Sequence, residues 1–566
     1  LQIILFQMMM IFADYLTATF VISIALLGLA VGGLIGAYCA GRAAISTMTA
    51  AALILPFGVM LAFGTAVKFM ATPLLASLLM MVPFACGSAV ITVALARAKS
   101  HLVYFIDLLG AAIGALAVCF ALGVFREESS LLFLSAFTAA LAICYAIYLR
   151  SPWGRGLTIA IASALCLGFV SVGVWNLQND ILNVVRYKVL RLHPQANVMY
   201  SRSSFVGRYD IVKRSPNSNT IKAYNNGRTI DTMRSTPPEE FQIDPRMPHT
   251  YLDNPSILIL GLSGDGVAKT SRFLSDRVVG IEINPRIVEL QSNELIPYNG
   301  NSYKDIEVHA MDGRSYLEAT DEQFDIVTLM NAHGARGAAE GSAPSPEYLF
   351  TVEAFHSYFD HMTDQGILNI EEPINRPRRE PPVWKMIVTI RQALIDRGIE
   401  HPENHFFVFQ WRTTTNNYIQ TVVKKTPLTE TDLSNLQRWL DEVDRVRQIE
   451  REQNRKLGPI RSITTILHMP YADYDTNYTR LLKGEVDAAV LQARNLRVTT
   501  DNRPFHFDVD PRHPNIRKAC IRAMLMSLLL LPFFVGFLMR RRGELRKLLP
   551  FVLAVGLTGL GYFLIE

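Results

Sequence analysis

The feature that most constrains this chain is a series of apolar segments in its first third. Each is about 20 residues long, the length that an α-helix needs to cross the hydrocarbon core of a bilayer. They lie at about 16–40, 46–66, 71–96, 102–125, 130–149 and 156–176, after a shorter run at 1–13, and two more follow at about 523–539 and 548–565. The sequence therefore predicts a polytopic α-helical membrane bundle, and we expect the intact protein to extend beyond Leu1 and Glu566.

Charged residues are scarce in these apolar parts and common between them. Residues 1–176 carry seven basic and four acidic residues, whereas residues 177–516 carry 40 basic and 44 acidic ones. The middle of the chain is therefore an ordinary, slightly acidic soluble domain. The net charge of +5 comes from the apolar parts at the two ends of the chain and not from the soluble domain. It therefore argues against a nucleic-acid partner. The partners we expect are the lipid bilayer and other membrane protein subunits.

Cysteine and histidine give no sign of a metal site. All six cysteines lie in or beside apolar segments, so the soluble domain has neither a structural disulfide nor a thiolate zinc site. His401 and His405 have a helical metal-ligand spacing, but Pro402 lies between them. A second group precedes the C-terminal apolar segments and consists of His506, Asp508, Asp510 and His513. Neither group forms a metal motif, and we predict no bound metal.

Basic loops indicate how the chain is oriented, because Lys and Arg accumulate on the cytoplasmic side. The loop at 540–547 holds five basic residues and one acidic residue, so we expect it to be cytoplasmic. Counting helices from there places the soluble domain outside the cytoplasm. The N-terminal loops agree, although Arg517, Lys518 and Arg522 point the other way. We predict a multi-pass protein of a bacterial-type inner membrane with its soluble domain on the periplasmic side.

Asp107 lies inside the apolar segment HLVYFIDLLGAAIGALA. An ionisable side chain at mid-membrane costs about 3 kcal/mol or more, so we expect Asp107 to face other helices, pair with a polar group or be protonated. One interpretation is a proton or substrate relay. The other, which we favour, is a structural hydrogen bond near the membrane interface.

The soluble domain begins with strand-like runs and continues with alternating strands and helices. Asn226-Gly227 between two such runs predicts a β-hairpin. Buried strands are expected at 256–260, 277–283, 305–311 and 324–330, each followed by a turn or a helical pattern. This alternation predicts a doubly wound α/β domain. A charged amphipathic helix follows at Thr429–Lys456, with Thr429 and Asp432 placed to cap its start.

Three successive strand ends carry residues suited to an adenosine-type ligand. Glycines after a central strand let the backbone approach a ligand, and a carboxylate at the end of the next strand commonly binds ribose hydroxyls. Asp312, followed by Gly313, is placed to reach an adenine. The predicted cofactor-binding residues are Gly261, Ser263, Gly264, Asp265, Gly266, Glu282, Asp312 and Gly313.

The motifs ILILGLSGDG, VVGIEINP, VHAMDGRSYL, FDIVTLM, PEYLFTVEAF and QGILNI together resemble the spermidine synthase family of aminopropyltransferases, which share the class I methyltransferase fold. The NNGRTID region is similar to that family's small N-terminal β domain. The segments ALLGLAVGGLIG, YFIDLLGAAIGAL, TDNRPFHF and GLTGLGYFLIE resemble the membrane-embedded branch of spermidine synthase-like proteins. The resemblance implies a Rossmann-like domain with a small β subdomain, and decarboxylated S-adenosylmethionine or a related nucleoside as the ligand if the pocket is functional.

This reading divides the chain into six parts. They are a transmembrane bundle at 1–176, a linker at 177–195, the β subdomain at 196–250, the spermidine synthase-like Rossmann domain at 251–425, a helical extension and linker at 426–516, and C-terminal transmembrane helices at 517–566.

The chain departs from the family at the position of the catalytic base. In active members the strand that corresponds to FDIVTLM ends in an aspartate that deprotonates or orients the attacking amine. Met330 stands at that position, and Asn331 is a poor base. His333, near the family's second aspartate, is the only substitute base we consider. The run GARGAAEGSAPSP (334–346) takes the place of the family's lid, and the acids that we consider for a polyamine are Asp265, Glu347 and Glu353.

Three functions remain open. The leading hypothesis is a catalytically degenerate domain that serves as an accessory or structural subunit of a membrane complex. The first alternative is a membrane-anchored aminopropyltransferase that uses His333 or a water network. The second is a transporter or polyamine-sensing protein, against which the lack of paired intramembrane charges argues mildly.

Overall fold

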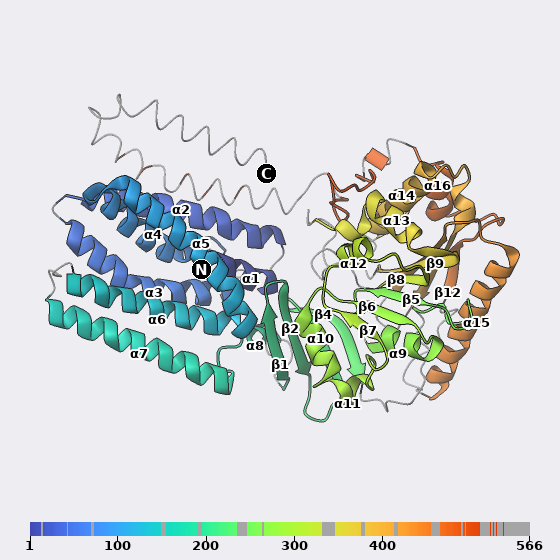
Figure 1. The fold of residues 1–566 in the computed structure, drawn as a ribbon, viewed down its shortest axis with the longest axis horizontal. Coiled ribbons are helices and arrows are strands. Elements are labelled where there is room, and N and C mark those ends of the chain that lie inside the picture. The colour runs from blue at the N-terminus through green and yellow to red at the C-terminus, as the bar shows by residue number, and fades with distance from the viewer. Residues whose placement is uncertain are drawn as a thin grey trace.

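A computed structural model describes residues 1–509 with the exception of 13–14, 42, 69–72, 149–153, 190–194, 235–245, 263–264, 331–345, 375–379, 413–416, 454–463, 488–490 and 493, and adds residues 521, 525, 528, 532 and 536. A helical bundle lies at one end of the molecule and an α/β domain at the other, with a small β-sheet between them (Figure 1).

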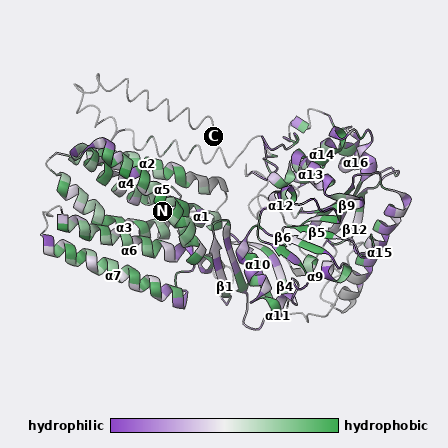
Figure 2. Cartoon of the chain, viewed as in Figure 1, coloured by the Kyte–Doolittle hydropathy of each residue, from purple (hydrophilic) through white to green (hydrophobic). Residues whose placement is uncertain are grey.

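The bundle consists of one short helix and six long ones. They are α1 (Gln2–Phe12), α2 (Tyr15–Cys39), α3 (Ala44–Lys68), α4 (Pro73–Arg97), α5 (Ser100–Val124), α6 (Glu127–Tyr148) and α7 (Arg155–Asn179). The six long helices are long and apolar enough to cross a membrane, which confirms the predicted multi-pass bundle. Figure 2 shows that they are predominantly hydrophobic. The segments predicted at 523–539 and 548–565 lie almost entirely outside the described residues.

Helix α2 packs closely on α4 through glycines. A Cβ atom added at Gly32 would lie 2.1 Å from the backbone oxygen of Ala85, and one added at Gly28 would lie 2.8 Å from the Cβ of Phe84. Gly36 is equally tight against α4. Since membrane helices associate largely by close packing of small residues, these glycines account for the approach of the two helices.

The small sheet is antiparallel in the order β1-β2-β3-β4. Its strands are β1 (Asn197–Ser204), β2 (Gly207–Lys213), β3 (Thr220–Asn225) and β4 (Arg228–Arg234). Asn226 and Gly227 connect β3 to β4 with φ angles of 48° and 71°. Positive φ at both central residues is typical of the type I′ turn, so the predicted hairpin is confirmed.

One face of this sheet shares a hydrophobic core with the bundle. Val198, Val212 and Tyr224 from the sheet are buried together with Met8 of α1 and Leu131 of α6. The short helix α8 (Val184–Val189), which follows the last bundle helix, contributes two more buried valines. The sheet therefore packs on the end of the bundle as part of one continuous core.

The large sheet has eight strands in the order β12-β10-β11-β9-β8-β5-β6-β7. They are β5 (Ile257–Leu260), β6 (Val278–Ile281), β7 (Glu307–His309), β8 (Phe324–Met330), β9 (Met362–Pro373), β10 (Phe406–Arg412), β11 (Asn417–Lys424) and β12 (Thr464–His468). Strands β5 to β9 run parallel and the other three pair antiparallel. The strand order reverses between β5 and β8, where doubly wound sheets bind ligands.

Helices cover both faces of this sheet (Figure 1). They are α9 (Asp265–Leu274), α10 (Pro285–Ser292), α11 (Ile296–Asn299), α12 (Gly313–Ala319), α13 (Val352–Asp360), α14 (Glu380–Asp396), α15 (Glu430–Gln453) and α16 (Asn477–Lys483). One core contains residues of α13, α14 and α16, and the other contains residues of α9 and α15. The fold class predicted from the sequence, a polytopic bundle with a Rossmann-like domain and a small β subdomain, is confirmed.

Candidate functional site

The turn after β5 is the start of the predicted nucleotide site. Gly261 has a φ of 86°, in the left-handed region that glycine adopts without strain. The backbone N–H groups of Gly261 and Leu262 both donate to the carbonyl oxygen of Ile281, at 2.9 and 3.0 Å. Asp265 and Gly266 begin helix α9, whereas Ser263 and Gly264 lie outside the described residues. The turn is therefore fastened to the end of the neighbouring strand β6.

Glu282 follows β6 directly, at the carboxyl edge of the sheet where the sequence predicts a ribose-binding acid. Its side chain is only 6% exposed, and its Oε1 accepts a hydrogen bond from the backbone N–H of Asn284 at 2.9 Å. Burial raises the pKa of Glu282 to about 7, although the Asn284 hydrogen bond opposes that shift. Burial therefore favours the protonated form of this carboxyl.

Asp312 follows β7 and caps helix α12. Its Oδ1 accepts hydrogen bonds from the backbone N–H groups of Arg314, at 3.1 Å, and Ser315, at 3.0 Å. The side chain is exposed, and Gly313 behind it is buried against Leu260. Its predicted adenine contact is not tested, whereas its capping role was not predicted, although an aspartate before a helical pattern indicates one.

Met330 is the last residue of β8 and is 3% exposed. It packs in the hydrophobic core that also contains Leu262 and Ile326. His333, Asn331 and nearly all of the predicted lid lie outside the described residues. The end of β8, where the resemblance implies a catalytic aspartate, therefore carries a buried thioether.

Two acidic residues that the sequence analysis overlooked lie beside Met330. Glu371 on β9 is the register partner of Met330 on β8, and Glu372 follows it; both are nearly fully buried. Because paired residues of neighbouring strands point to the same face, Glu371 shares a face with Met330 and Glu372 lies on the opposite one. Two consecutive acids in the otherwise uncharged stretch ILNIEEP were the signal that could have revealed them.

Residues 499–509 form a strap that contacts the residues following the predicted lid. Asp501 binds both Arg314 Nη1, at 2.6 Å, and Thr351 Oγ1, at 2.7 Å. The backbone N–H of Asp501 donates to Glu353 Oε2 at 3.0 Å, and the N–H of Glu347 donates to the carbonyl oxygen of Pro504. Glu353, considered for a polyamine, therefore binds the strap.

Lys385 of α14 is buried beneath the same strap. Its Nζ donates to the carbonyl oxygens of Phe505, at 2.8 Å, and Asp508, at 3.0 Å. Burial lowers the pKa of Lys385 to about 8. His506 is fully buried and stacks on the ring of Phe350, with ring centroids 4.6 Å apart. No group of metal-ligating side chains occurs in the described part of the chain.

A second polar site joins the small sheet to the bundle. Arg208 on β2 donates from Nη1 to Glu127 Oε2, at 2.9 Å, and to Glu128 Oε2, at 2.7 Å. Its Nε donates to Asp210 Oδ1 at 2.9 Å, and its Nη2 donates to Asn183 Oδ1 at 3.0 Å. We call Glu127, Glu128, Arg208 and Asp210 the junction cluster; their side chains are completely buried.

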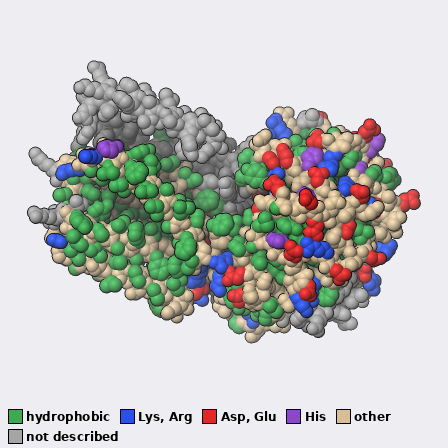
Figure 3. Space-filling view, in the orientation of Figure 1, with side chains coloured by type: hydrophobic (Ala, Val, Ile, Leu, Met, Phe, Trp, Pro, Cys, Tyr) green, Lys and Arg blue, Asp and Glu red, His purple; other side chains and the backbone are tan. Residues whose placement is uncertain are grey.

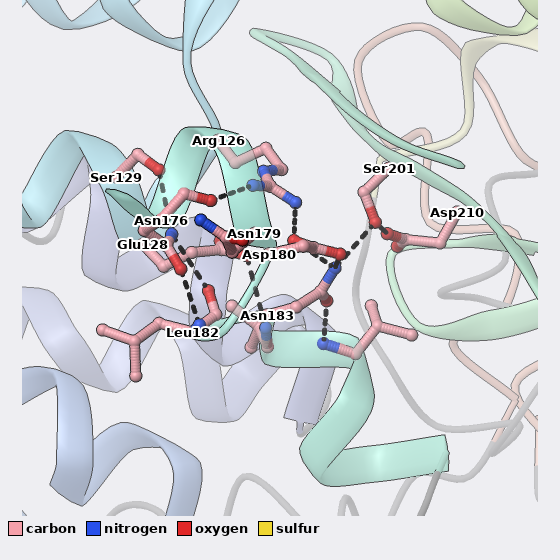
Figure 4. A network of polar contacts seen from close by, with 12 residues as sticks. Arg126, Glu128, Ser129, Asn176, Asn179, Asp180, Leu182, Asn183, Ser201 and Asp210 are labelled. Atoms are coloured by element: carbon pink, nitrogen blue, oxygen red, sulfur yellow. Dashed lines mark hydrogen bonds and ion pairs between the residues drawn. The ribbon is translucent and has the colours of Figure 1, made fainter. Parts of the chain in front are cut away.

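Further polar groups surround the junction cluster (Figure 4). Arg126 pairs with Asp180, and the amide of Asn176 donates to Ser129 Oγ at 3.1 Å. The side-chain amide of Asn183 donates to Ser201 Oγ at 3.0 Å, and Ser201 Oγ in turn donates to Asp210. The adjacent charges of Arg126, Glu127 and Glu128 lie between two apolar segments, and their spacing in the sequence contains no sign of this burial.

Asp107, the predicted intramembrane polar residue, lies on α5 with its side chain exposed. Helix α5 is the least buried of the six long helices. Gly110 and Gly114 follow on the same face, and nothing lies within 4 Å of a Cβ added at either. Among the described residues, Asp107 therefore does not face another helix of the bundle, and the other expected surroundings of its side chain stay predictions.

Comparisons with known proteins complete this description. No family model matches the sequence, and no curated protein matches it. Matching solved structures include a spermidine synthase in complex with the transition-state analogue AdoDATO and spermidine synthase from Thermotoga maritima; each is 17% identical, with a TM-score of 0.32 over 53% of this chain and 88% of that chain. A probable spermidine synthase from Corynebacterium glutamicum is 14% identical, with a TM-score of 0.30 over 43% and 85%. In these comparisons the chain is similar to spermidine synthases, the family that its motifs resemble.

Proposed function

We propose that this chain is an integral membrane protein whose spermidine synthase-like domain does not transfer aminopropyl groups and acts as an accessory or structural subunit of a membrane complex. The observation that carries the proposal is the burial of Met330 at the end of β8. An amine must lose a proton to attack the carbon bonded to a sulfonium, so a proton acceptor is required there. A thioether cannot accept that proton.

The two predicted ligand-binding carboxylates also make internal hydrogen bonds. Glu282 accepts from the N–H of Asn284, and Asp312 caps helix α12. Each bond stabilises the protein without any ligand, since buried or capping carboxylates need such donors. Both residues therefore have a structural reason to be present in a protein that does not bind a nucleoside.

The distribution of basic residues supports an extracytoplasmic domain. The end of the bundle away from the sheets carries Arg97 at the end of α4, Lys99 just before α5, and Arg155 at the start of α7. Basic side chains are visible at that end in Figure 3, while charges of both signs cover the α/β domain. By the positive-inside rule, the remote end is cytoplasmic. Nucleoside sulfonium donors are made in the cytoplasm and would not reach a domain on the other side.

The exposed face of α5 is the surface that we assign to a partner subunit. An exposed aspartate in a membrane span is costly unless a polar group covers it, and open glycines permit close approach of another helix. Asp107, Gly110 and Gly114 provide both features on one face. A partner helix with a polar or basic side chain at the depth of Asp107 would satisfy it.

Two measurements test this proposal. The purified full-length protein is incubated with decarboxylated S-adenosylmethionine and a diamine, and we expect no aminopropyl transfer above a protein-free blank. Sidedness is measured with a membrane-impermeant thiol reagent on Asp364→Cys, an exposed position on the soluble domain, in a cysteine-free background. Two results would contradict the proposal. One is aminopropyl transfer by the wild-type protein, and the other is labelling of Asp364→Cys only after the membrane has been permeabilised.

One observation favours the alternative of a membrane-anchored aminopropyltransferase. Glu371 is the register partner of Met330, so its carboxylate lies one strand away from the place where the family's base belongs. If the transfer assay is positive, Glu371→Gln should lower the rate by about 100-fold or more, the usual effect of losing a general base. Glu372→Gln, on the opposite face, is the matched control and should change the rate little.

A further inference from the structure

Exposed tyrosine and tryptophan side chains of the bundle lie close to the helix ends. Among the described residues of the long helices they are Tyr38, Tyr104, Tyr148 and Trp175, each no more than four residues from an end of its helix. Exposed phenylalanine, in contrast, also occurs in the middle of a helix, as at Phe57 of α3. Tyrosine and tryptophan are enriched at the two membrane interfaces, because their rings are apolar and their polar groups stay hydrated there. These side chains therefore indicate where the bundle enters and leaves the bilayer.

Trp175 marks the interface on the side of the small sheet. It follows Arg155, at the end of the bundle away from the sheets, by 20 residues, which is about 30 Å along a helix. The hydrocarbon core of a bilayer has the same thickness of about 30 Å. The next residue, Asn176, donates to Ser129 Oγ in the first turn of α6 at 3.1 Å. The interface on this side therefore lies at the level where α7 ends and α6 begins.

The turn between β1 and β2 lies at this same level. Arg208, near the start of β2, binds Glu127 and Glu128, the first two residues of α6. On α1, Gln7 Nε2 donates to the backbone carbonyl oxygen of Phe205 in the turn at 3.2 Å. The backbone of the turn is thus fastened to two helices of the bundle.

Phe205 presents its side chain outward from this turn. It is 68% exposed, whereas the preceding Ser204 is buried. A phenyl ring has no polar group for water to hydrate, so a ring held in water on a fastened turn is unfavourable. The boundary between lipid headgroups and acyl chains, in contrast, takes up phenylalanine side chains of membrane-bound segments.

Helix α8, which follows α7, also divides into a buried and an exposed face. Val184 and Val185 are buried in the core that the small sheet shares with the bundle, whereas Tyr187 is 46% exposed. The neighbouring Arg186 is partly exposed. A tyrosine beside an arginine suits the headgroup region, where the ring contacts apolar groups and the guanidinium contacts lipid phosphates.

We propose that the β1–β2 turn and helix α8 bind the bilayer surface, with Phe205 in the upper acyl-chain region and Tyr187 among the headgroups. The occupant of this surface is the leaflet that surrounds the bundle on the side of the small sheet, because both segments continue the outer surface of the membrane helices at the level of Trp175. The small sheet is thereby a lipid-binding element. This property depends neither on aminopropyl transfer nor on the side of the membrane on which the soluble domain lies.

The test places a spin label on single cysteines in the full-length, otherwise cysteine-free protein, in nanodiscs of phosphatidylcholine and phosphatidylglycerol. Collisions of the label with oxygen, which concentrates in the bilayer, are compared with collisions with a water-soluble nickel chelate. Phe205→Cys and Tyr187→Cys should each give an oxygen-to-nickel ratio severalfold higher than Tyr471→Cys does. Tyr471 is the matched control, since its side chain is 69% exposed on the α/β domain. Trp175→Cys serves as the reference for a label at the interface.

Two results would overturn the proposal. A label at either position that meets nickel as often as Tyr471→Cys lies in water, and a label that is shielded from both reagents is covered by protein instead of lipid. If Phe205→Cys does not fold, the partly exposed Val206 in the same turn takes the label as Val206→Cys, and the same readings decide the outcome.

Discussion

Arg208 Nη1 lies 2.7 Å from Glu128 Oε2, and this contact joins a strand of the soluble half to the first turn of a membrane helix. Removing one partner of a buried ion pair leaves the other charge uncompensated. Arg208→Met should therefore destabilise the protein by about 3–5 kcal/mol, measured by denaturant unfolding in detergent. Arg202→Gln, whose exposed guanidinium lies 3.8 Å from Glu294, is the control and should cost less than about 1 kcal/mol. Equal losses in both variants would contradict a special role for Arg208.

Glu282 should make stability fall as pH rises. Its pKa is raised from 4.5 to about 7 in the folded protein, so the folded state holds the proton more tightly than the unfolded state does. This contribution is fully present below about pH 4.5 and is lost progressively up to about pH 7, a change of about 3 kcal/mol. Glu282→Gln should flatten that part of the stability profile, measured as the unfolding midpoint against pH. An unchanged profile would show that the carboxyl is solvated in solution.

Lys385 should make the free energy of unfolding rise with pH in the alkaline range. Its pKa is lowered from 10.5 to about 8, so the unfolded state binds the proton more tightly than the folded state. The linked free energy of unfolding should rise by about 3 kcal/mol between about pH 8 and pH 10.5. Lys385→Met should abolish this rise while losing the hydrogen bonds to Phe505 and Asp508. A rise that persists in Lys385→Met must come from another group.

The start of α15 offers a local test of helix capping. Asp432 N donates to Thr429 Oγ1 at 3.2 Å, and Thr429 N donates to Asp432 Oδ2 at 2.8 Å, which is a reciprocal capping arrangement. Thr429→Ala should cost about 1 kcal/mol, measured by denaturant unfolding. Ser434→Ala, at an exposed position of the same helix, should be neutral or slightly stabilising.

The partner surface on α5 can be tested by blocking it. Gly110→Ile and Gly114→Ile place branched side chains where another helix would approach, so they should reduce assembly with a partner subunit, measured as complex size on native gels of extracted membranes. Leu116→Ile, an exposed substitution on a different face of α5, should leave the complex unchanged. If all three variants behave alike, lipid rather than protein covers the Asp107 face.

Several parts of the fold could be read directly from local sequence patterns. The Asn226-Gly227 turn, the apolar spans and the cap of α15 each depend on neighbouring residues, so their signals are contained in short stretches of sequence. The carboxyl-edge positions of Glu282, Asp312 and Met330 followed in the same way from the ends of predicted strands. The actual contacts of these residues, however, did not follow from those positions.

The features that escaped prediction depend on contacts between distant segments. Glu127 and Arg208 are 81 residues apart, and only the folded chain shows that a charge cluster beside a membrane span is buried against a β-strand. The strap that holds Lys385 likewise comes from residues more than 100 positions away. The pair of acids that contains Glu371 is visible in the sequence, but its pairing with Met330 arises from the register of β8 and β9, which short-range patterns do not specify.

The core shared by the small sheet and the bundle has a consequence for biogenesis. Val198, Val212 and Tyr224 are buried against membrane helices, as is the guanidinium of Arg208. A secreted fragment that starts near residue 196 would expose this apolar surface, and Arg208 would lack its partners Glu127 and Glu128. Such an exposed apolar surface favours aggregation. We therefore expect the soluble half to fold only after the preceding helices have been inserted into the membrane. Membrane integration would then control when the residues that follow can fold.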